Sequence, residues 1–333
     1  MPRTSMSLIA LATATCLNGC FGLSAQDEIR LNTFKYNSKK FMEAEQFARA
    51  ENACRKGLEM EPEDYSLNLA LGYSLLRQGG AQRIPESVST FERAVDVEPG
   101  FDVRCRLGLG EAQFQYGMLW SNQILYAEAD ERLTPEERAV AIAEAELNRD
   151  EAYGSAEEAL LEALDSTDGR DNSAAQSTLA RLYSILGRYE EAADVLRKMT
   201  STLTNSIRVR RELDAESIPE ERRELWARML EQLEEQNVSG LGLLANVASK
   251  IERWEEVISV YARMEAEGWM QTADYFNRAQ AYEALSARHA AIQDYETFYR
   301  QAAGKGSAFT DSVRVAMRRA AELRDGGDFL ENS

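Results

Sequence analysis

Histidine is almost absent from this 333-residue sequence, which contains only His289. A single imidazole cannot build a histidine-rich metal site and leaves little room for histidine-based catalysis. A dinucleotide-binding loop is also missing, because Gln113 replaces the third glycine of the pattern that begins at Gly108 and no strand precedes it. Cys54 and Cys105 are expected to be free and buried, since the periodicity described below places them two repeats apart. We therefore expect no enzymatic activity, cofactor, metal or small-molecule substrate.

Proline and positive charge are also scarce. Six prolines interrupt a chain rich in alanine, leucine, glutamate and arginine, and this composition favours helix throughout. Lysine and arginine total 38 against 56 acidic residues, so the net charge is −18. Such a chain repels nucleic acid and anionic membrane surfaces, and no basic run offsets this, so we expect no nucleic-acid partner. The hydrophobic content of 44% is still high enough to build a core.

The first residues resemble an export signal of the bacterial lipoprotein type. Arg3 supplies a positive charge, and the apolar stretch 8–17 is too short to span a bilayer. This stretch ends in the letters LNGC at 17–20, which resemble a lipobox and predict lipidation of Cys20. The expected location is then the bacterial cell envelope, with a lipid anchor in a membrane and the chain facing the periplasm or the exterior. Ordinary secretion after cleavage at Ala25 and an unprocessed chain are the alternatives.

After this segment, one helical pattern recurs six times. Small, bulky and small residues stand at steps of four and three, which places them on one stripe of a helix. These stripes begin at Ala50, Ser87, Ala156, Ala192, Val257 and Ala291. Each is preceded by a second stripe centred on a small residue, at Ser38, Gly72, Gly110, Ala180, Ala245 and Ala279. Like positions recur after 34 residues from Ser38 to Gly72 and from Ala245 to Ala279.

This pattern resembles the tetratricopeptide repeat (TPR) family. The match is close at Gly72 with Leu75 and at Ala180 with Tyr183, and the repeats cover most of 31–305. The resemblance implies an all-α solenoid of helix-turn-helix units, in which small residues let paired helices approach and each repeat contacts only its neighbours. We therefore predict an all-α TPR solenoid with two irregular helical insertions.

Two stretches interrupt the period. In the third repeat the small residues Gly110 and Ala156 are 46 positions apart, which exceeds the usual separation by 34. The excess is either a degenerate extra repeat or a long helical hairpin, and Glu144, which fits the small site badly, favours the hairpin. The predicted organisation is a signal peptide (1–19), a linker (20–30), repeats 1–4 (31–206) with an insertion near 118–152, a second helical insertion (207–237), repeats 5–6 (238–305) and a capping helix (308–325).

The TPR family binds peptides in a concave groove lined by the first helix of each repeat. The resemblance therefore implies a scaffold that binds a protein or peptide partner. The alternatives are a structural subunit of a secretion, pilus or outer-membrane assembly complex and an accessory, non-catalytic subunit of an enzyme. Carried onto this sequence, the groove candidates are Lys35, Lys39, Tyr73, Arg77, Arg104, Phe114, Arg181, Lys250, Phe276 and Gln280. Their positive charges indicate either a basic groove or an ordinary solvated helix face.

The negative charge is unevenly distributed along the chain. Fifteen acidic and four basic residues lie within 118–171, so this segment alone carries a charge of −11. Long exposed helices need charge for solubility, which is one explanation. The other is an acidic arm that binds a basic partner. The sequence is compatible with both.

Overall fold

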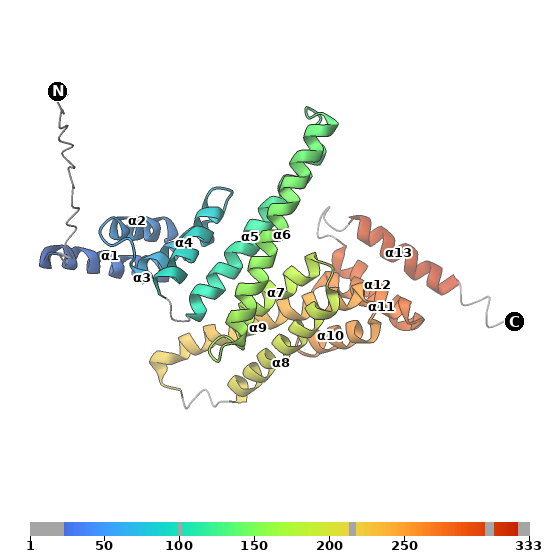
Figure 1. The fold of residues 1–333 in the computed structure, drawn as a ribbon. Coiled ribbons are helices and arrows are strands. Elements are labelled where there is room, and N and C mark those ends of the chain that lie inside the picture. Colours follow the sequence, from blue (N-terminus) through green and yellow to red (C-terminus); the bar gives the residue numbers. More distant parts are fainter. Residues whose placement is uncertain (1–22, 99–101, 213–217, 304–309, 326–333) are drawn as a thin grey trace, which may run out of the picture.

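Every regular element of the structure is an α-helix. The computed structural model describes residues 23–98, 102–212, 218–303 and 310–325, and these ranges contain thirteen helices and no strand (Figure 1). The helices are α1 (Ala25–Glu43), α2 (Phe47–Leu58), α3 (Tyr65–Gln78), α4 (Arg83–Val97), α5 (Val103–Ala129), α6 (Pro135–Asp165), α7 (Ser173–Ile185), α8 (Tyr189–Glu212), α9 (Glu220–Lys250), α10 (Trp254–Ala266), α11 (Thr272–Ala284), α12 (Arg288–Ala302) and α13 (Thr310–Asp325). The predicted all-α class is confirmed. Cys20 and the predicted signal peptide lie outside the described residues, and α1 begins inside the segment 20–30 that is predicted as a linker.

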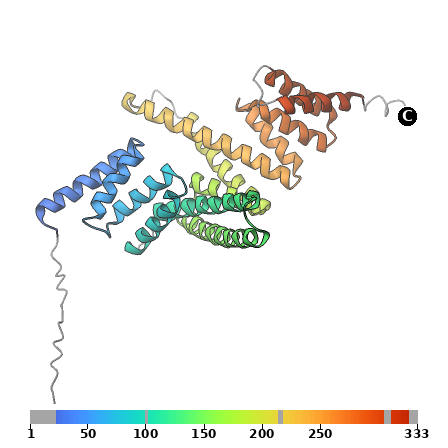
Figure 2. The ribbon, with the colours of Figure 1, turned by 90° about the horizontal axis from the view of Figure 1, so that it is seen from above.

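The first twelve helices form six successive hairpins, and these hairpins are the six repeats. In the second repeat, the hydroxyl of Ser87 donates to the carbonyl of Gly72 at 2.8 Å. A Cβ atom on Gly72 would lie 2.8 Å from the ring of Phe91, so only glycine allows α3 and α4 to approach this closely. Figure 2 shows the hairpins in an elongated array with α1 and α13 at opposite ends.

The turns inside four of the repeats share one backbone geometry. The residue five positions before the small residue of the second helix has a positive φ, at Glu45 (54°), Gly187 (73°), Glu252 (56°) and Ser286 (58°). The following N–H donates to the carbonyl five residues earlier, as in the bond of 2.8 Å from Arg188 to Tyr183. This is the Schellman closure of a helix C-terminus, which favours glycine at the positive-φ position.

The third repeat is a long hairpin and not two repeats. α5 has 27 residues and α6 has 31, and both continue past the helix crossing at Gly110 to a turn at 130–134. Thr134 caps α6, because its hydroxyl accepts from the N–H of Glu137 while the Glu137 carboxylate accepts from the N–H of Thr134. Figure 1 shows the end of this hairpin rising clear of the neighbouring helices. We name the part within 118–152 the acidic arm.

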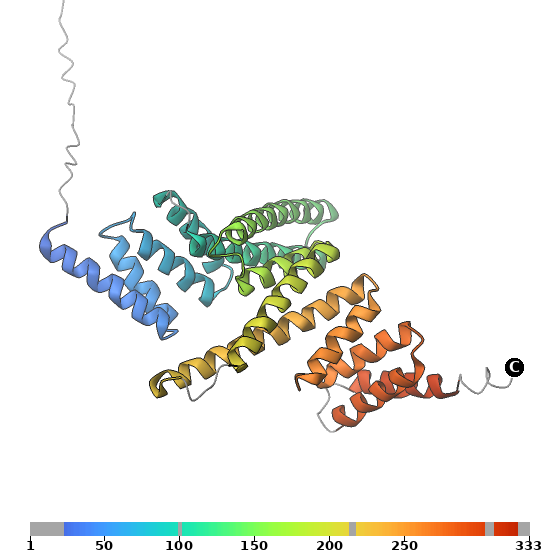
Figure 3. The same ribbon diagram turned by 90° about the horizontal axis from the view of Figure 1, so that it is seen from below.

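The second irregular stretch, 207–237, contains the end of α8 and the first half of α9, so the last helix of repeat 4 and the first helix of repeat 5 are both lengthened. Residues 213–217 lie outside the described residues. Leu203 and Ile207 of α8 are buried, and the amide of Asn237 in α9 donates to the Thr204 hydroxyl at 3.2 Å. Figure 3 shows the two helices side by side. We name the part within 196–244 the α8–α9 junction.

The apolar core runs along the array in several clusters. The largest joins repeats 3, 4 and 5 through residues such as Leu160, Leu196 and Leu244. At the C-terminal end, Ala316 and Ala320 of α13 pack into the cluster of repeat 6 and cover it, which is the role predicted for a capping helix. Across the described ranges, no helix is both long and apolar enough to span a membrane.

Candidate binding groove on helices α9, α10 and α11

A hollow of about 390 Å³ lies between repeats 5 and 6. It contains two of the predicted groove residues, Lys250 and Gln280. The remaining lining residues are Gly242, Ala245, Asn246 and Ser249 of α9, Trp254, Val257 and Tyr261 of α10, and Asp274 and Asn277 of α11. The first helices of two consecutive repeats therefore form its sides, and the second helix of repeat 5 lies between them.

Helical spacing explains why these side chains meet. Asn246, Ser249 and Lys250 stand at steps of three and one on the last two turns of α9, so they share one side of that helix. Asp274, Asn277 and Gln280 stand at steps of three along α11 and share the side that faces them. The sides of the hollow therefore carry amides, a hydroxyl, one cation and one carboxylate. Its floor is formed by apolar side chains of α10. Such a set suits the alternating donors and acceptors of a peptide backbone.

Two polar residues of the groove are held in place by the surrounding structure. The Asn277 amide donates to the Tyr261 hydroxyl at 3.3 Å, and burial raises the pKa of that tyrosine. The N–H of Gln271 donates to the Asp274 carboxylate at 2.7 Å, in the capping box that starts α11. Burial raises the pKa of Asp274, although this hydrogen bond acts in the opposite direction. Lys250 lies in the last turn of α9, where a cation is favoured by the helix dipole.

A buried ion network fixes α11 from behind the groove. The Arg278 guanidinium contacts Asp294 of α12 at 2.6 Å and Glu265 of α10 at 2.7 Å. Its side chain and that of Asp294 are each less than a tenth exposed. Because removing one partner would leave a buried charge, this network opposes rotation of α11 and keeps Asn277 and Gln280 in the groove.

The predicted groove residues in the N-terminal half do not form a free basic surface. Lys35 pairs with Asp64, Arg77 lies 3.5 Å from Glu111, and Arg104 contacts Asp102 at 2.7 Å. The Tyr73 hydroxyl donates to the carbonyl of Arg104 at 2.6 Å, so this ring joins α3 to α5. Lys39 is exposed and has no ion-pair partner in the part of the chain that the structure describes.

Both predicted phenylalanines pack inside the protein. Phe114 is 4% exposed, and the Arg181 guanidinium lies over its ring at 5.4 Å. The prediction that Phe114 lines a groove is therefore wrong, because its position on the first helix of an extended repeat turns it toward α6 and α7. Phe276 is half-buried and its ring packs on Tyr295 at a centroid distance of 5.6 Å.

Sequence reasoning missed most of the polar lining of the hollow. The sequence around the polar lining residues does not distinguish them from other polar residues on helix surfaces. These residues are Asn246, Ser249, Asp274 and Asn277. The available signal was helical spacing, because Asn246 stands four residues before Lys250 and Asn277 stands three residues before Gln280. Trp254 is the first residue of α10, and no pattern in the sequence indicated that it lines the hollow.

Reactive side chains do not gather in the described parts of the chain, where no cluster of three potential metal ligands occurs. Burial raises the pKa of the Cys54 thiol to about 12 and of the Cys105 thiol to about 11, so both are unreactive at neutral pH. His289 is exposed near the start of α12 and not in the turn before it.

The tetratricopeptide repeat family model matches residues 39–83, which include the end of α1, α2, α3 and the turn into α4. This match confirms the predicted TPR pattern at residues 39–83, and the other hairpins repeat the same helix-turn-helix arrangement. PilF of Pseudomonas aeruginosa is 12% identical and has a TM-score of 0.49, over 87% of this chain and 99% of that one. A thermophilic TPR protein of Thermus thermophilus is 14% identical with a TM-score of 0.41, over 78% and 98%. The TPR2AB domain of yeast Sti1, solved as a pHSP90 complex, is 14% identical with a TM-score of 0.31, over 88% and 99%. No curated protein sequence matches.

Proposed function

We propose that this protein is a non-catalytic scaffold that binds an extended segment of a partner protein in the groove of α9, α10 and α11. The observation that carries the proposal is the hollow itself, in which Lys250, Asn246 and Asn277 surround an apolar floor. Asn246 and Gln280 are exposed beside it, so their amides are accessible to a peptide backbone. TPR proteins as a group bind protein partners, which supports the same role here.

A display selection of random peptides against the full chain tests this proposal. Peptides that bind the groove should lose about tenfold or more in affinity for the double variant Asn246→Ala/Asn277→Ala, because two amide contacts are removed. The matched control is Asn32→Ala/Asn205→Ala, which removes two exposed amides far from the groove. Selected peptides that bind both variants as tightly as the wild type would show that the groove is not the binding site.

We further propose that the scaffold is exported and anchored to a bacterial envelope membrane through lipid on Cys20. The LNGC motif at 17–20 supports this, and each buried CH₂ of an acyl chain contributes about 0.8 kcal/mol to membrane attachment. Metabolic labelling with a fatty-acid analogue should tag the wild type and leave Cys20→Ala unlabelled. Label retained by the variant would exclude this anchor without affecting the groove proposal.

A further inference from the structure

The acidic arm has a surplus of unpaired carboxylates. Within 118–152 there are nine acidic and three basic residues. All three arginines are already engaged inside the arm: Arg132 with Asp130 at 2.7 Å, Arg149 with Asp150 at 2.8 Å, and Arg138 with the carbonyl of Asp130 at 2.9 Å. Within the described structure, no side chain pairs with the carboxylates of Glu131, Glu136, Glu144, Glu146 and Glu151. Solubility alone would explain these charges, so the apolar groups beside them decide the interpretation.

Large apolar side chains are exposed on the same arm. Tyr126 of α5 is 70% exposed, and Val140 and Leu147 of α6 are 67% and 70% exposed. Val140, Glu144 and Leu147 stand at steps of four and three, so they form one stripe along α6. Single exposed apolar residues are ordinary on a protein surface, whereas two large ones in one stripe flanked by unpaired carboxylates match a surface that a partner covers.

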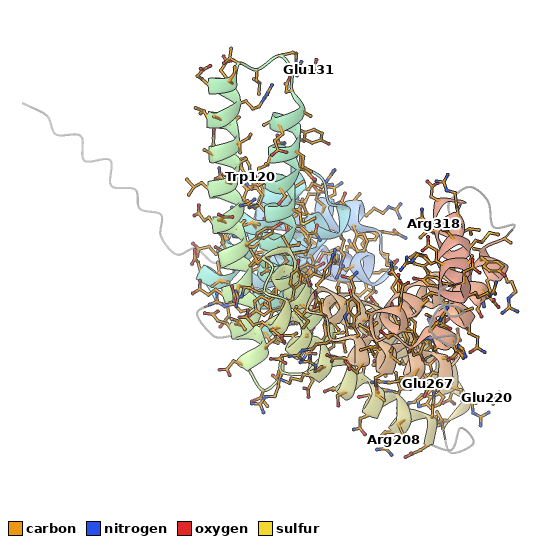
Figure 4. The ribbon with its side chains drawn as sticks, turned by 90° about the vertical axis from the view of Figure 1, so that its right-hand side faces the viewer. Trp120, Glu131, Arg208, Glu220, Glu267 and Arg318 are labelled. Carbon is orange, nitrogen blue, oxygen red and sulfur yellow. The ribbon has the colours of Figure 1, made fainter. Side chains whose placement is uncertain are left out.

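A separate hollow of about 320 Å³ lies between α5 and α6, on the side of α6 opposite to Val140 and Leu147. Its lining residues are Trp120, Gln123, Tyr126, Ala127, Asp130, Leu133, Ala141, Glu144 and Ala145. Tyr126 and Glu144 therefore belong both to the hollow and to the exposed surface. The indole N–H of Trp120 is buried and has no acceptor among the described residues, so a donor is left unsatisfied here. Figure 4 shows Glu131 at the end of the arm, clear of the other helices, and Trp120 near its base.

We propose that the outer face of α6, along the stripe of Val140, Glu144 and Leu147, is a docking site for a basic amphipathic helix of a partner protein. Apolar side chains of that helix cover Val140 and Leu147, and lysine or arginine side chains beside them pair with the free carboxylates. Val140 and Leu147 lie about 10 Å apart at 1.5 Å per residue, so two to three turns of partner helix suffice. An anionic membrane or a nucleic acid would be repelled by the same carboxylates. The site is separate from the groove of α9, α10 and α11.

The probe that tests this site is a synthetic helical peptide of about 14 residues with leucines on one face and lysines on the other. The matched probe keeps the leucines and replaces every lysine with glutamate. Fluorescence anisotropy of labelled peptide with the full chain should show binding of the lysine peptide only. The affinity should fall by about tenfold or more between about 50 and 300 mM salt, since the charge pairs are exposed.

The residues of this site are exposed, so they can be substituted without disrupting the hydrophobic core. Val140→Ser/Leu147→Ser should weaken binding of the lysine peptide about tenfold or more, and Glu144→Gln/Glu146→Gln should weaken it and flatten its salt dependence. The matched control is Leu225→Ser/Met229→Ser, two exposed apolar residues of α9, which should change the affinity by less than about twofold. Far-UV circular dichroism verifies that each variant is folded.

Three results would overturn the proposal: equal binding of both peptides, no binding to the wild type, or unchanged binding by the arm variants. Sedimentation without peptide identifies a competing occupant, because dimers that disappear in Val140→Ser/Leu147→Ser would assign the face to a second copy of this chain. The groove variant Asn246→Ala/Asn277→Ala should bind the lysine peptide normally. Loss of binding there would place the peptide in the groove, so failure of one site is distinguishable from failure of the other.

Discussion

The two long helical hairpins differ in where the extra turns were added. The acidic arm lengthens both helices of one repeat, so the added turns extend away from the array and contact mainly each other. The α8–α9 junction lengthens the last helix of repeat 4 and the first helix of repeat 5, which together form the interface between repeats. The added end of α8 therefore contacts other elements, and Arg211 contacts both Glu234 of α9 and Glu267 after α10.

The surroundings of the two regions follow from this difference. Within the added turns of the junction, Ile207 of α8 is 3% exposed, whereas Leu225 and Met229 at the start of α9 are 56% and 40% exposed. On the outer side of the arm, Val140 and Leu147 are exposed, and the ion pairs are local, such as Arg149 with Asp150. The solenoid thus carries the insertion within a repeat as an appendage, whereas the lengthened end of α8 packs partly into the interface between repeats. The appendage is free to acquire a binding function.

The comparison is tested most strongly by one leucine from each region. Leu203→Ala in the junction should lower the free energy of unfolding by about 2–5 kcal/mol, because a buried side chain leaves a cavity. Leu147→Ala on the arm should change it by less than about 0.5 kcal/mol, since the side chain is exposed. Urea unfolding followed by circular dichroism measures both. Similar losses in the two variants would mean that the arm is as integrated as the junction.

A pair of helical glycines gives the next largest contrast. A Cβ atom on Gly240 would lie 2.2 Å from the Met199 side chain, whereas one on Gly154 would meet nothing within 4 Å. Gly240→Val should therefore cost about 1–3 kcal/mol through overpacking of the junction. Gly154→Val should be neutral or slightly stabilising, because valine is a better helix former than glycine. Thermal unfolding in which both variants lose stability equally would contradict the open outer face of α6.

The sequence predicts the repeats well because the contacts that define them are local. Gly72 and Ser87, or Ala180 and Ala192, meet within one hairpin, so their spacing alone reveals the helix pairs. The start of α6 after Thr134 and of α9 after Pro219 also follows from local capping and turn chemistry.

The binding surfaces are less predictable because they depend on contacts between repeats. Spacing cannot show that Lys35 is neutralised by Asp64 or Arg77 by Glu111. It also cannot show that Asn246 of α9 faces Asn277 of α11 across a hollow. Charge and helix position identified Lys250 and Gln280, but only the packing of repeats 5 and 6 selects them from the other candidates.

Ion pairs provide a contrast that depends on pH. Arg197 of α8 contacts Glu256 of α10 at 2.6 Å, and this hydrogen bond lowers the pKa of Glu256 below its usual value. A carboxylate with a lowered folded-state pKa stabilises the fold above its unfolded-state pKa of about 4.3, and this contribution is lost as the pH falls through the folded-state value. Glu256→Gln should therefore cost about 1 kcal/mol at pH 7 and progressively less as the pH is lowered towards about 3.

The control for this pair lies on the arm. Asp150→Asn removes the exposed contact with Arg149 and should cost less than about 0.5 kcal/mol at either pH. A Glu256→Gln effect that is the same at both pH values would show that the variant acts through packing and not through the charge.

The smallest expected effect separates the turn of an ordinary repeat from the turn of the arm. Glu45 closes the first repeat with a φ of 54°, a conformation that costs a residue with a side chain about 1 kcal/mol relative to glycine. Glu131 lies in the arm turn and does not have a positive φ. Both are exposed glutamates, so Glu45→Gly and Glu131→Gly change the charge equally.

Glu45→Gly should raise the free energy of unfolding by about 0.5 kcal/mol, because relief of the backbone strain at this position outweighs the greater freedom of glycine in the unfolded chain. Glu131→Gly should lower it by about 0.4–1 kcal/mol, because only the unfolded chain gains. Chemical denaturation resolves the two signs, and a loss in both variants would show that the positive φ at Glu45 carries no strain.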